Sequence, residues 1–239
     1  MTVEIDFSSQ LKTELTEMQE AGRIVANRHR ILGKTSDNIV GELLRVYDDF
    51  FEWDHYPEGD VYDFETHGQY YYHAHPNEER PGEHGHFHTF LRPDGMPPGI
   101  RPAPVEDFMM PENPDDALSH LGAIAMNPKG FPVKLFTTNR WVTGEIWYEA
   151  RHVCRFLHRF EIDMPHPSWL VNVWVTNMVT MFRPQLRELN DLRDKMIEAW
   201  KQRYPDRNVY EDRDLEVTSE CSVDLDAQMA SVAAALANS

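Results

Sequence analysis

Apolar residues near the start of the chain recur every three or four positions, which is the period of an amphipathic helix. Residues 11–25 follow this spacing, and residues 36–51 repeat it with an inner face formed by Val40, Leu43, Tyr47 and Phe50. The pattern therefore predicts N-terminal helices within residues 1–55, packed against a larger body.

The period changes to two between Val61 and His75. Aromatic side chains occupy most even positions there, polar side chains occupy most odd ones, and the aromatic side continues at Phe87 and Leu91 of the next segment. Alternation of this kind indicates strands with one core face and one polar face. We expect one long strand, interrupted near Gly68, and a return strand that pairs with it.

A second hairpin is predicted over residues 120–139. Two largely apolar segments flank Asn127-Pro128-Lys129-Gly130, and these residue types favour a tight turn. Between the hairpins, residues 92–117 contain seven prolines, which disfavour both helices and central strands. We expect a long irregular loop, serving either as a lid or as a rigid surface wrap.

Helical spacing returns after residue 143. Thr143 is a suitable cap for a helix over residues 144–160, and Ser168 for an uncharged helix over residues 169–182. That helix is shorter than the roughly 20 residues that span a bilayer. An amphipathic helix is expected after Pro184, then a charged connector over residues 204–221 and a final helix over residues 225–236.

These elements predict one α+β domain over residues 1–239. Its antiparallel sheet would be built from two hairpins in residues 61–140, interrupted by the loop 92–117. Residues 1–55 and 143–239 would supply the helices packed with the sheet. This architecture implies no particular function, so function must be argued from the site.

Charge and cysteine content narrow the class of protein. The 239 residues include 23 basic and 40 acidic side chains, a formal net charge of −17, which disfavours a nucleic-acid partner. The two cysteines, Cys154 and Cys221, form neither a disulfide framework nor a thiolate zinc motif. The N-terminus lacks the features of a secretory signal. We expect a soluble protein of the reducing cytoplasm, without a membrane partner and with its oligomeric state open.

Five histidines gather in residues 68–91. They form an HxH motif and, nine residues later, an HxHxH motif: His73, His75, His84, His86 and His88. Side chains two apart on a strand share a face, so each motif places its histidines on one side. The loop between the motifs, residues 76–83, is even in length, which brings both sets to the same face of a hairpin. The expected opposed pairs are His75 with His84, His73 with His86, and Tyr71 with His88.

Opposed side chains on one face have β-carbons about 5 Å apart, so three or four imidazoles can converge on one ion. Three histidine ligands with an open position suit a catalytic zinc or iron. The expected first ligands are His73, His75 and His86, and either His84 or His88 would replace one of them, add a fourth, or lie in the shell of residues around the ligands. Nearby residues that could orient a ligand or move a proton are Glu65, His67, Tyr71, Glu79 and Glu83, and of these Glu83 and Tyr71 are the expected catalytic residues.

The leading hypothesis is a metal-dependent enzyme acting on a small molecule. A metal-binding protein without catalysis, for storage, delivery or sensing, is the alternative, because such a protein tolerates surplus ligands. A polar strand face that is merely rich in histidine would give the same pattern without any metal.

Three resemblances accompany these motifs. His73-Ala74-His75 followed by Glu79 partly resembles the first metal motif of cupins, and HxH with a third histidine on a neighbouring strand is similar to the zinc site of alpha-type carbonic anhydrases. The segments YYYHAHP, GEHGHFHTFL and LFTTNRWVTGE resemble an uncharacterised bacterial family, a domain of unknown function. That resemblance implies a bacterial origin and places Asn139, Arg140 and Glu145 in the site region. A cap between sheet and helix would explain the same residues.

Overall fold

The computed structural model describes residues 3–105 and 109–238. Across these residues the chain has a mixed α+β fold, as predicted, with one six-stranded antiparallel sheet and seven α-helices. The strands lie side by side in sequence order: β1 (Tyr56–Tyr62), β2 (Gly68–His73), β3 (Gly85–Leu91), β4 (Ser119–Met126), β5 (Pro132–Thr138) and β6 (Val217–Ser222).

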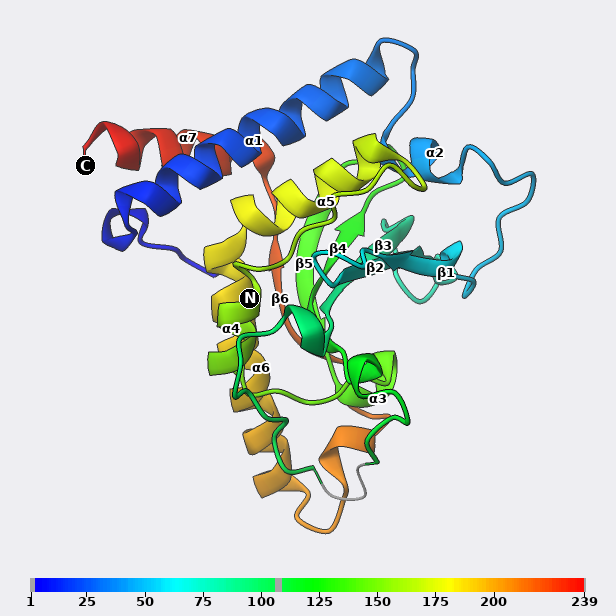
Figure 1. The fold of residues 1–239 in the computed structure, drawn as a ribbon, viewed down its shortest axis with the longest axis vertical. Helices are drawn as coiled ribbons and strands as arrows, with labels where there is room; N and C mark the ends of the chain where they lie inside the picture. The colour runs from blue at the N-terminus through cyan, green and yellow to red at the C-terminus, as the bar shows by residue number, and fades with distance from the viewer. Residues whose placement is uncertain (1–2, 106–108, 239) are drawn as a thin grey trace.

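Helices from both ends of the chain pack with this sheet (Figure 1). Over one face, α5 lies against β2 and β3: the Tyr70 hydroxyl donates to Asn172 Oδ1 at 2.6 Å, and Phe87 packs on Trp174 with ring centroids 5.5 Å apart. No helix in the described parts of the chain is long and apolar enough to cross a membrane. The helices are α1 (Lys12–Gly33), α2 (Ile39–Leu44), α3 (Arg140–Thr143), α4 (Ala150–Phe156), α5 (Trp169–Met181), α6 (Arg183–Arg203) and α7 (Leu225–Ala237).

The hairpin of β4 and β5 forms where the turn residues predicted it. Asn127 Oδ1 accepts the backbone N–H groups of Lys129 and Phe131, and the Gly130 N–H donates to the Asn127 carbonyl. Gly130 has a φ of 74°, which a glycine adopts without steric cost. Local turn chemistry is therefore sufficient to define this hairpin.

Residues 61–75 do not form the expected long strand. The chain reverses after β1 because Asp63 Oδ1 accepts the N–H groups of Glu65 and Thr66, while the Asp63 N–H donates to the Gly68 carbonyl. β1 and β2 therefore pair with each other. The interruption expected near Gly68 is a complete turn that adds a strand to the sheet.

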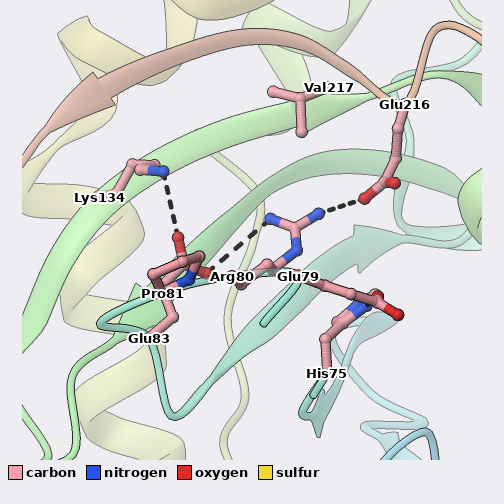
Figure 2. A pocket seen from close by; sticks show the side chains of 8 residues that line it. All are labelled: His75, Glu79, Arg80, Pro81, Glu83, Lys134, Glu216 and Val217. Atoms are coloured by element: carbon pink, nitrogen blue, oxygen red, sulfur yellow. Dashed lines mark hydrogen bonds and ion pairs between the residues drawn. The ribbon is translucent and has the colours of Figure 1, made fainter. Parts of the chain in front are cut away.

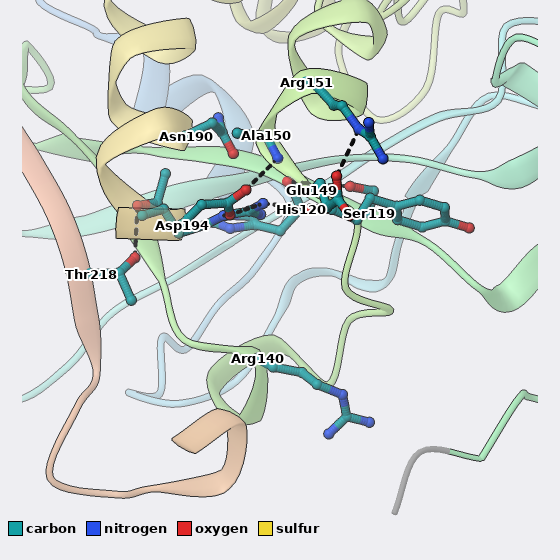
Figure 3. A network of polar contacts seen from close by, with 12 residues as sticks. Ser119, His120, Arg140, Glu149, Ala150, Arg151, Asn190, Asp194 and Thr218 are labelled. Atoms are coloured by element: carbon teal, nitrogen blue, oxygen red, sulfur yellow. Dashed lines mark hydrogen bonds and ion pairs between the residues drawn. The ribbon is translucent and has the colours of Figure 1, made fainter. Parts of the chain in front are cut away.

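The prediction of a helix over residues 144–160 is also wrong about the residue at which the helix begins. Gly144 has a φ of 66° and ends α3, since a left-handed glycine terminates a helix. α4 begins only at Ala150, whose N–H donates to Asp194 Oδ2 at 2.6 Å (Figure 3). This start escaped sequence analysis because the capping carboxylate comes from α6.

Two further boundaries differ from the prediction. The helix expected over residues 36–51 ends at Leu44, and the connector expected over residues 204–221 contains most of β6, whose Cys221 lies opposite Leu135 of β5. Val217 and Thr218 are β-branched and favour a strand. Because charged residues surround them, the sequence pattern predicted a connector here and not a strand.

The irregular loop predicted over residues 92–117 is present in its described part, with short 3-10 turns at Pro93–Gly95 and Pro114–Asp116. Residues 106–108 lie outside the described residues. The Ala103 N–H donates to the Trp147 carbonyl at 2.8 Å, so this part of the loop lies against the segment before α4.

Both faces of the central strands are covered. Every residue of β2, β3 and β4 is buried, including the histidines on the polar face. The aromatic face is core, as predicted, with Tyr70, Tyr72 and Phe87 fully buried. Buried polar groups rarely lack partners, so any unpartnered nitrogen on the histidine face needs an explanation.

Candidate metal centre

The register of β2 and β3 places the histidines as the loop length predicted. His73 lies opposite His86, and Tyr71 lies opposite His88. β4 then flanks β3 on its other side and extends the same buried face. The middle of the sheet therefore holds imidazoles from neighbouring strands close together.

His73, His75 and His86 form a group that could hold a metal ion. One possible ligand atom from each lies within 4.8 Å of the others, and the Nε2 atoms of His73 and His86 are 2.8 Å apart. The three ring centroids are separated by 5.0, 4.5 and 5.2 Å. Imidazoles bound to one tetrahedral ion have centroids roughly 5 Å apart, so the arrangement matches such a site.

His75 joins this group although β2 ends two residues before it. The Trp53 N–H donates to the Ala74 carbonyl at 2.9 Å, and the Trp53 ring lies against the His75 ring with centroids 4.2 Å apart. His75 Nδ1 lies 3.4 Å from Glu79 Oε2. The segment before β1 and the carboxylate of Glu79 together hold an imidazole that strand geometry alone leaves unplaced.

Burial keeps these imidazoles neutral. It lowers the pKa of His73 to about 3, with smaller contributions from neighbouring His75, His55 and Arg80, and it lowers the pKa of His75 as well. The pKa of His86 is held well below its ordinary value, mainly by burial. A neutral imidazole is the form that binds metal, so these three side chains do not have to lose a proton before they bind an ion.

A cavity of about 310 Å³ adjoins the histidine group (Figure 2). His75 and Glu83 line it together with Glu79, Arg80, Lys134 and Glu216. Lys134 Nζ lies 3.1 Å from Glu83 Oε1, and the Arg80 guanidinium pairs with Glu216. The cavity is therefore polar, and among its described lining residues none comes from the loop 92–117.

His88 lies beside the group and is completely buried. Its ring centroid is 4.8 Å from that of His86 and 5.3 Å from that of His73. Its Nδ1 faces His120 Nε2 at 3.0 Å, whereas its Nε2 has no hydrogen-bond partner among the described residues. His88 therefore adjoins the group of three without belonging to it, and keeps one buried nitrogen unpartnered among the described residues.

His84 departs from the expected face. Its Nδ1 lies 2.7 Å from the Tyr72 hydroxyl, on the aromatic side of the hairpin, and the expected pairing with His75 does not occur. β3 begins only at Gly85, where a Cβ would lie 2.6 Å from the Tyr72 hydroxyl oxygen, and its pairing with β2 begins at His86. His84 precedes the strand, so the alternation of faces that assigned it to the metal face does not apply to it.

The two residues expected to transfer protons differ in position. Glu83 lines the cavity, but Tyr71 is buried beneath His55, whose ring stacks on it with centroids 3.7 Å apart. Burial raises the pKa of the Tyr71 hydroxyl above its usual value. Tyr71 therefore forms part of the wall of the site, away from the cavity lining.

The structure adds His120, which the five-histidine pattern did not include, and places Glu145 next to it. His120 of β4 is buried against His88, and Glu145 Oε2 accepts the His120 N–H at 2.7 Å. Burial raises the pKa of Glu145 to about 7. Glu145 thus contacts the backbone of His120 beside the histidine face, while the Asn139 side chain accepts the Arg140 N–H as a helix cap.

A second group, His67, Asp94 and Asp115, also brings possible ligand atoms within 4.8 Å. The Tyr62 hydroxyl donates to Asp115 Oδ2 at 2.8 Å and lies 2.9 Å from His67 Nδ1. Since a hydroxyl already bridges two of the three residues, this group needs no ion to satisfy it.

Comparison with known proteins identifies the family of the chain. No curated protein and no solved structure was found to match it. Residues 19–223 match the family model described as a domain of unknown function (DUF6969), and this match spans all six strands and the histidine group. The chain therefore belongs to the DUF6969 family.

Proposed function

We propose that His73, His75 and His86 bind one divalent transition metal ion, zinc or iron, and that the protein is an enzyme acting on a small polar molecule in the adjoining cavity. This proposal rests on the approach of one possible ligand atom from each of the three imidazoles to within 4.8 Å of the others, with His73 and His86 buried and His75 partly buried. Bound there, the ion would supply Lewis acidity or a water of lowered pKa.

The cavity residues suit a polar ligand. Arg80 and Lys134 bring positive charge, and Glu79 and Glu216 bring negative charge to a space of about 310 Å³, which is at the small end of ligand sites. The Glu79 side chain is 52% exposed and adjoins His75, so it is better placed than Tyr71 to exchange a proton with solvent. We assign it that role in the proposed reaction.

A metal-binding protein without catalysis is the second candidate. His88 favours it, because a fourth buried imidazole would close the coordination shell and leave no position for substrate. The two functions therefore differ in whether His88 or an exchangeable water completes the shell.

Metal analysis of untagged protein tests both candidates. After stripping and reconstitution with Zn²⁺ or Fe²⁺, we expect one ion per chain, and the triple variant His73→Ala/His75→Ala/His86→Ala should retain almost none. Less than about 0.1 ion per chain in the wild type would refute metal binding altogether.

The Co²⁺-substituted protein separates the two candidates. Azide should shift its visible spectrum if the ion has an open position, as an enzyme requires. A spectrum that is insensitive to azide in the wild type, and becomes sensitive in His88→Ala, would indicate a closed shell and a binding protein.

A further inference from the structure

We infer that Glu83 positions His86 for metal binding and does not itself act on the substrate. This inference rests on the metal site proposed above. Of the two roles open to Glu83 from the sequence, moving a proton or orienting a ligand, it assigns the second.

Glu83 and His86 present two buried atoms to each other. Glu83 Oε2 lies 3.9 Å from His86 Nδ1, with the side chains 8% and 1% exposed. Within the described residues, neither atom has a hydrogen-bond partner. Shortening this separation by about 1 Å would make a hydrogen bond that satisfies both.

The other nitrogen of His86 faces the proposed ion. Its Nε2 lies 2.8 Å from His73 Nε2, inside the histidine group. A carboxylate beside Nδ1 keeps the ring proton on Nδ1 and leaves the lone pair on Nε2. Glu83 would thus select the tautomer and the ring orientation that a metal ion needs.

Glu83 is itself held by cations from two sides, which Figure 2 shows. Lys134 Nζ lies 3.1 Å from Oε1, and Arg80 Nη1 lies 3.9 Å from Oε2. Lys134 comes from β5, so its position is set by the sheet. Both carboxylate oxygens therefore face groups of the protein: Oε1 faces Lys134, and Oε2 faces His86.

Glu83→Gln tests this role because it keeps the size of the side chain. Lys134 can only donate, so it should retain the amide oxygen and turn the amide NH₂ toward His86 Nδ1. That NH₂ would favour the proton on Nε2, the wrong tautomer for binding. We expect Zn²⁺ affinity, measured by competition with a chromophoric chelator, to fall about 10- to 100-fold.

Tautomers are read directly by long-range ¹H–¹⁵N correlation of the imidazole rings in metal-free protein. We expect the His86 proton on Nδ1 in the wild type and on Nε2 in Glu83→Gln. The double variant Glu83→Gln/Lys134→Met frees the amide to turn over, and should regain part of the lost affinity. Glu220→Gln, which removes the other carboxylate at Lys134, is the matched control and should bind as the wild type does.

The inference is overturned if Glu83→Gln binds Zn²⁺ as tightly as the wild type, or if His86 in the wild type carries its proton on Nε2. The second measurement decides the question even if the variant fails to fold. Failure of the wild type to bind any metal would refute the proposed function, whereas normal binding by both proteins would refute only the role of Glu83.

Discussion

The Nε2 atoms of His73 and His86 face each other at 2.8 Å across the pairing of β2 with β3. Two neutral imidazoles at this separation share one proton, because one nitrogen must donate and the other must accept. A metal ion that takes both lone pairs displaces that proton. The pair is built into two central strands, so its geometry does not depend on a mobile loop.

Replacing His86 or His84 with alanine should separate metal binding from stability. His86→Ala removes a proposed ligand and should lower Zn²⁺ affinity by at least about 100-fold, more than loss of a supporting group costs. His84→Ala should leave affinity unchanged but lower the free energy of unfolding by about 1–3 kcal/mol, since the hydroxyl of the buried Tyr72 loses its partner. Chelator competition and urea unfolding of both variants measure this. Equal affinities would contradict the assignment of His86.

Gly85 should not tolerate a side chain. A Cβ there would lie 2.5 Å from the His73 carbonyl oxygen and 2.6 Å from the Tyr72 hydroxyl oxygen. Gly85→Ala is expected to cost roughly 1–3 kcal/mol or more by urea unfolding, as overpacking does. Gly33→Ala is the control: nothing lies within 4 Å of its Cβ, and this position ends α1. It should be neutral or stabilising by up to about 1 kcal/mol.

Among the polar residues of α5, Asn172 should cost the most stability when it is replaced by alanine. Its side chain accepts from the Tyr70 hydroxyl and donates to the carbonyls of Met164 and His166. Asn172→Ala leaves the buried Tyr70 hydroxyl and two part-buried carbonyls without this partner and should lower the free energy of unfolding by roughly 3 kcal/mol. Asn177→Ala, which removes only a bond to the Val173 carbonyl in the same helix, should cost less than about 1 kcal/mol. Similar losses in both variants would argue against this role of Asn172.

His29 should make the fold sensitive to acid. Its Nε2 accepts from Trp174 Nε1, and burial lowers its pKa from 6.5 to about 4. Between these values the unfolded chain binds a proton that the native protein does not, so stability is complete above pH 6.5 and declines as pH falls toward 4. In EDTA, the wild type should lose up to about 2 kcal/mol more than His29→Gln between pH 6.5 and 5. If urea unfolding shows the same fall in the free energy of unfolding for both proteins, His29 contributes nothing to the acid sensitivity.

Trp53 should report on the metal site. Its ring lies 4.2 Å from the His75 ring, measured between centroids. Co²⁺ binding is expected to quench indole fluorescence, and Trp53→Phe should remove most of that change. Trp169→Phe, an exposed residue beginning α5, should keep it. Undiminished quenching in Trp53→Phe would place the ion elsewhere.

Local patterns determined much of this protein. Alternation assigned the aromatic face of β2 and β3 to the core, and the even loop between the motifs determined that His73 lies opposite His86. Register follows from counting because the side-chain period of a strand is two and the loop joins adjacent strands. The turn at Asn127 and the helix α5 follow from equally local signals.

The tertiary structure decided the other features of the site and the fold, because they depend on contacts between residues far apart in the chain. Whether the histidine face is covered depended on Trp53, His55 and residues 76–83, and the start of α4 depended on Asp194 of α6. His84 left the group because strand alternation ends at Gly85, where Tyr72 fills the space that a side chain would need. A periodic pattern describes residues inside an element, so it cannot place those beyond its end or the groups that pack across it.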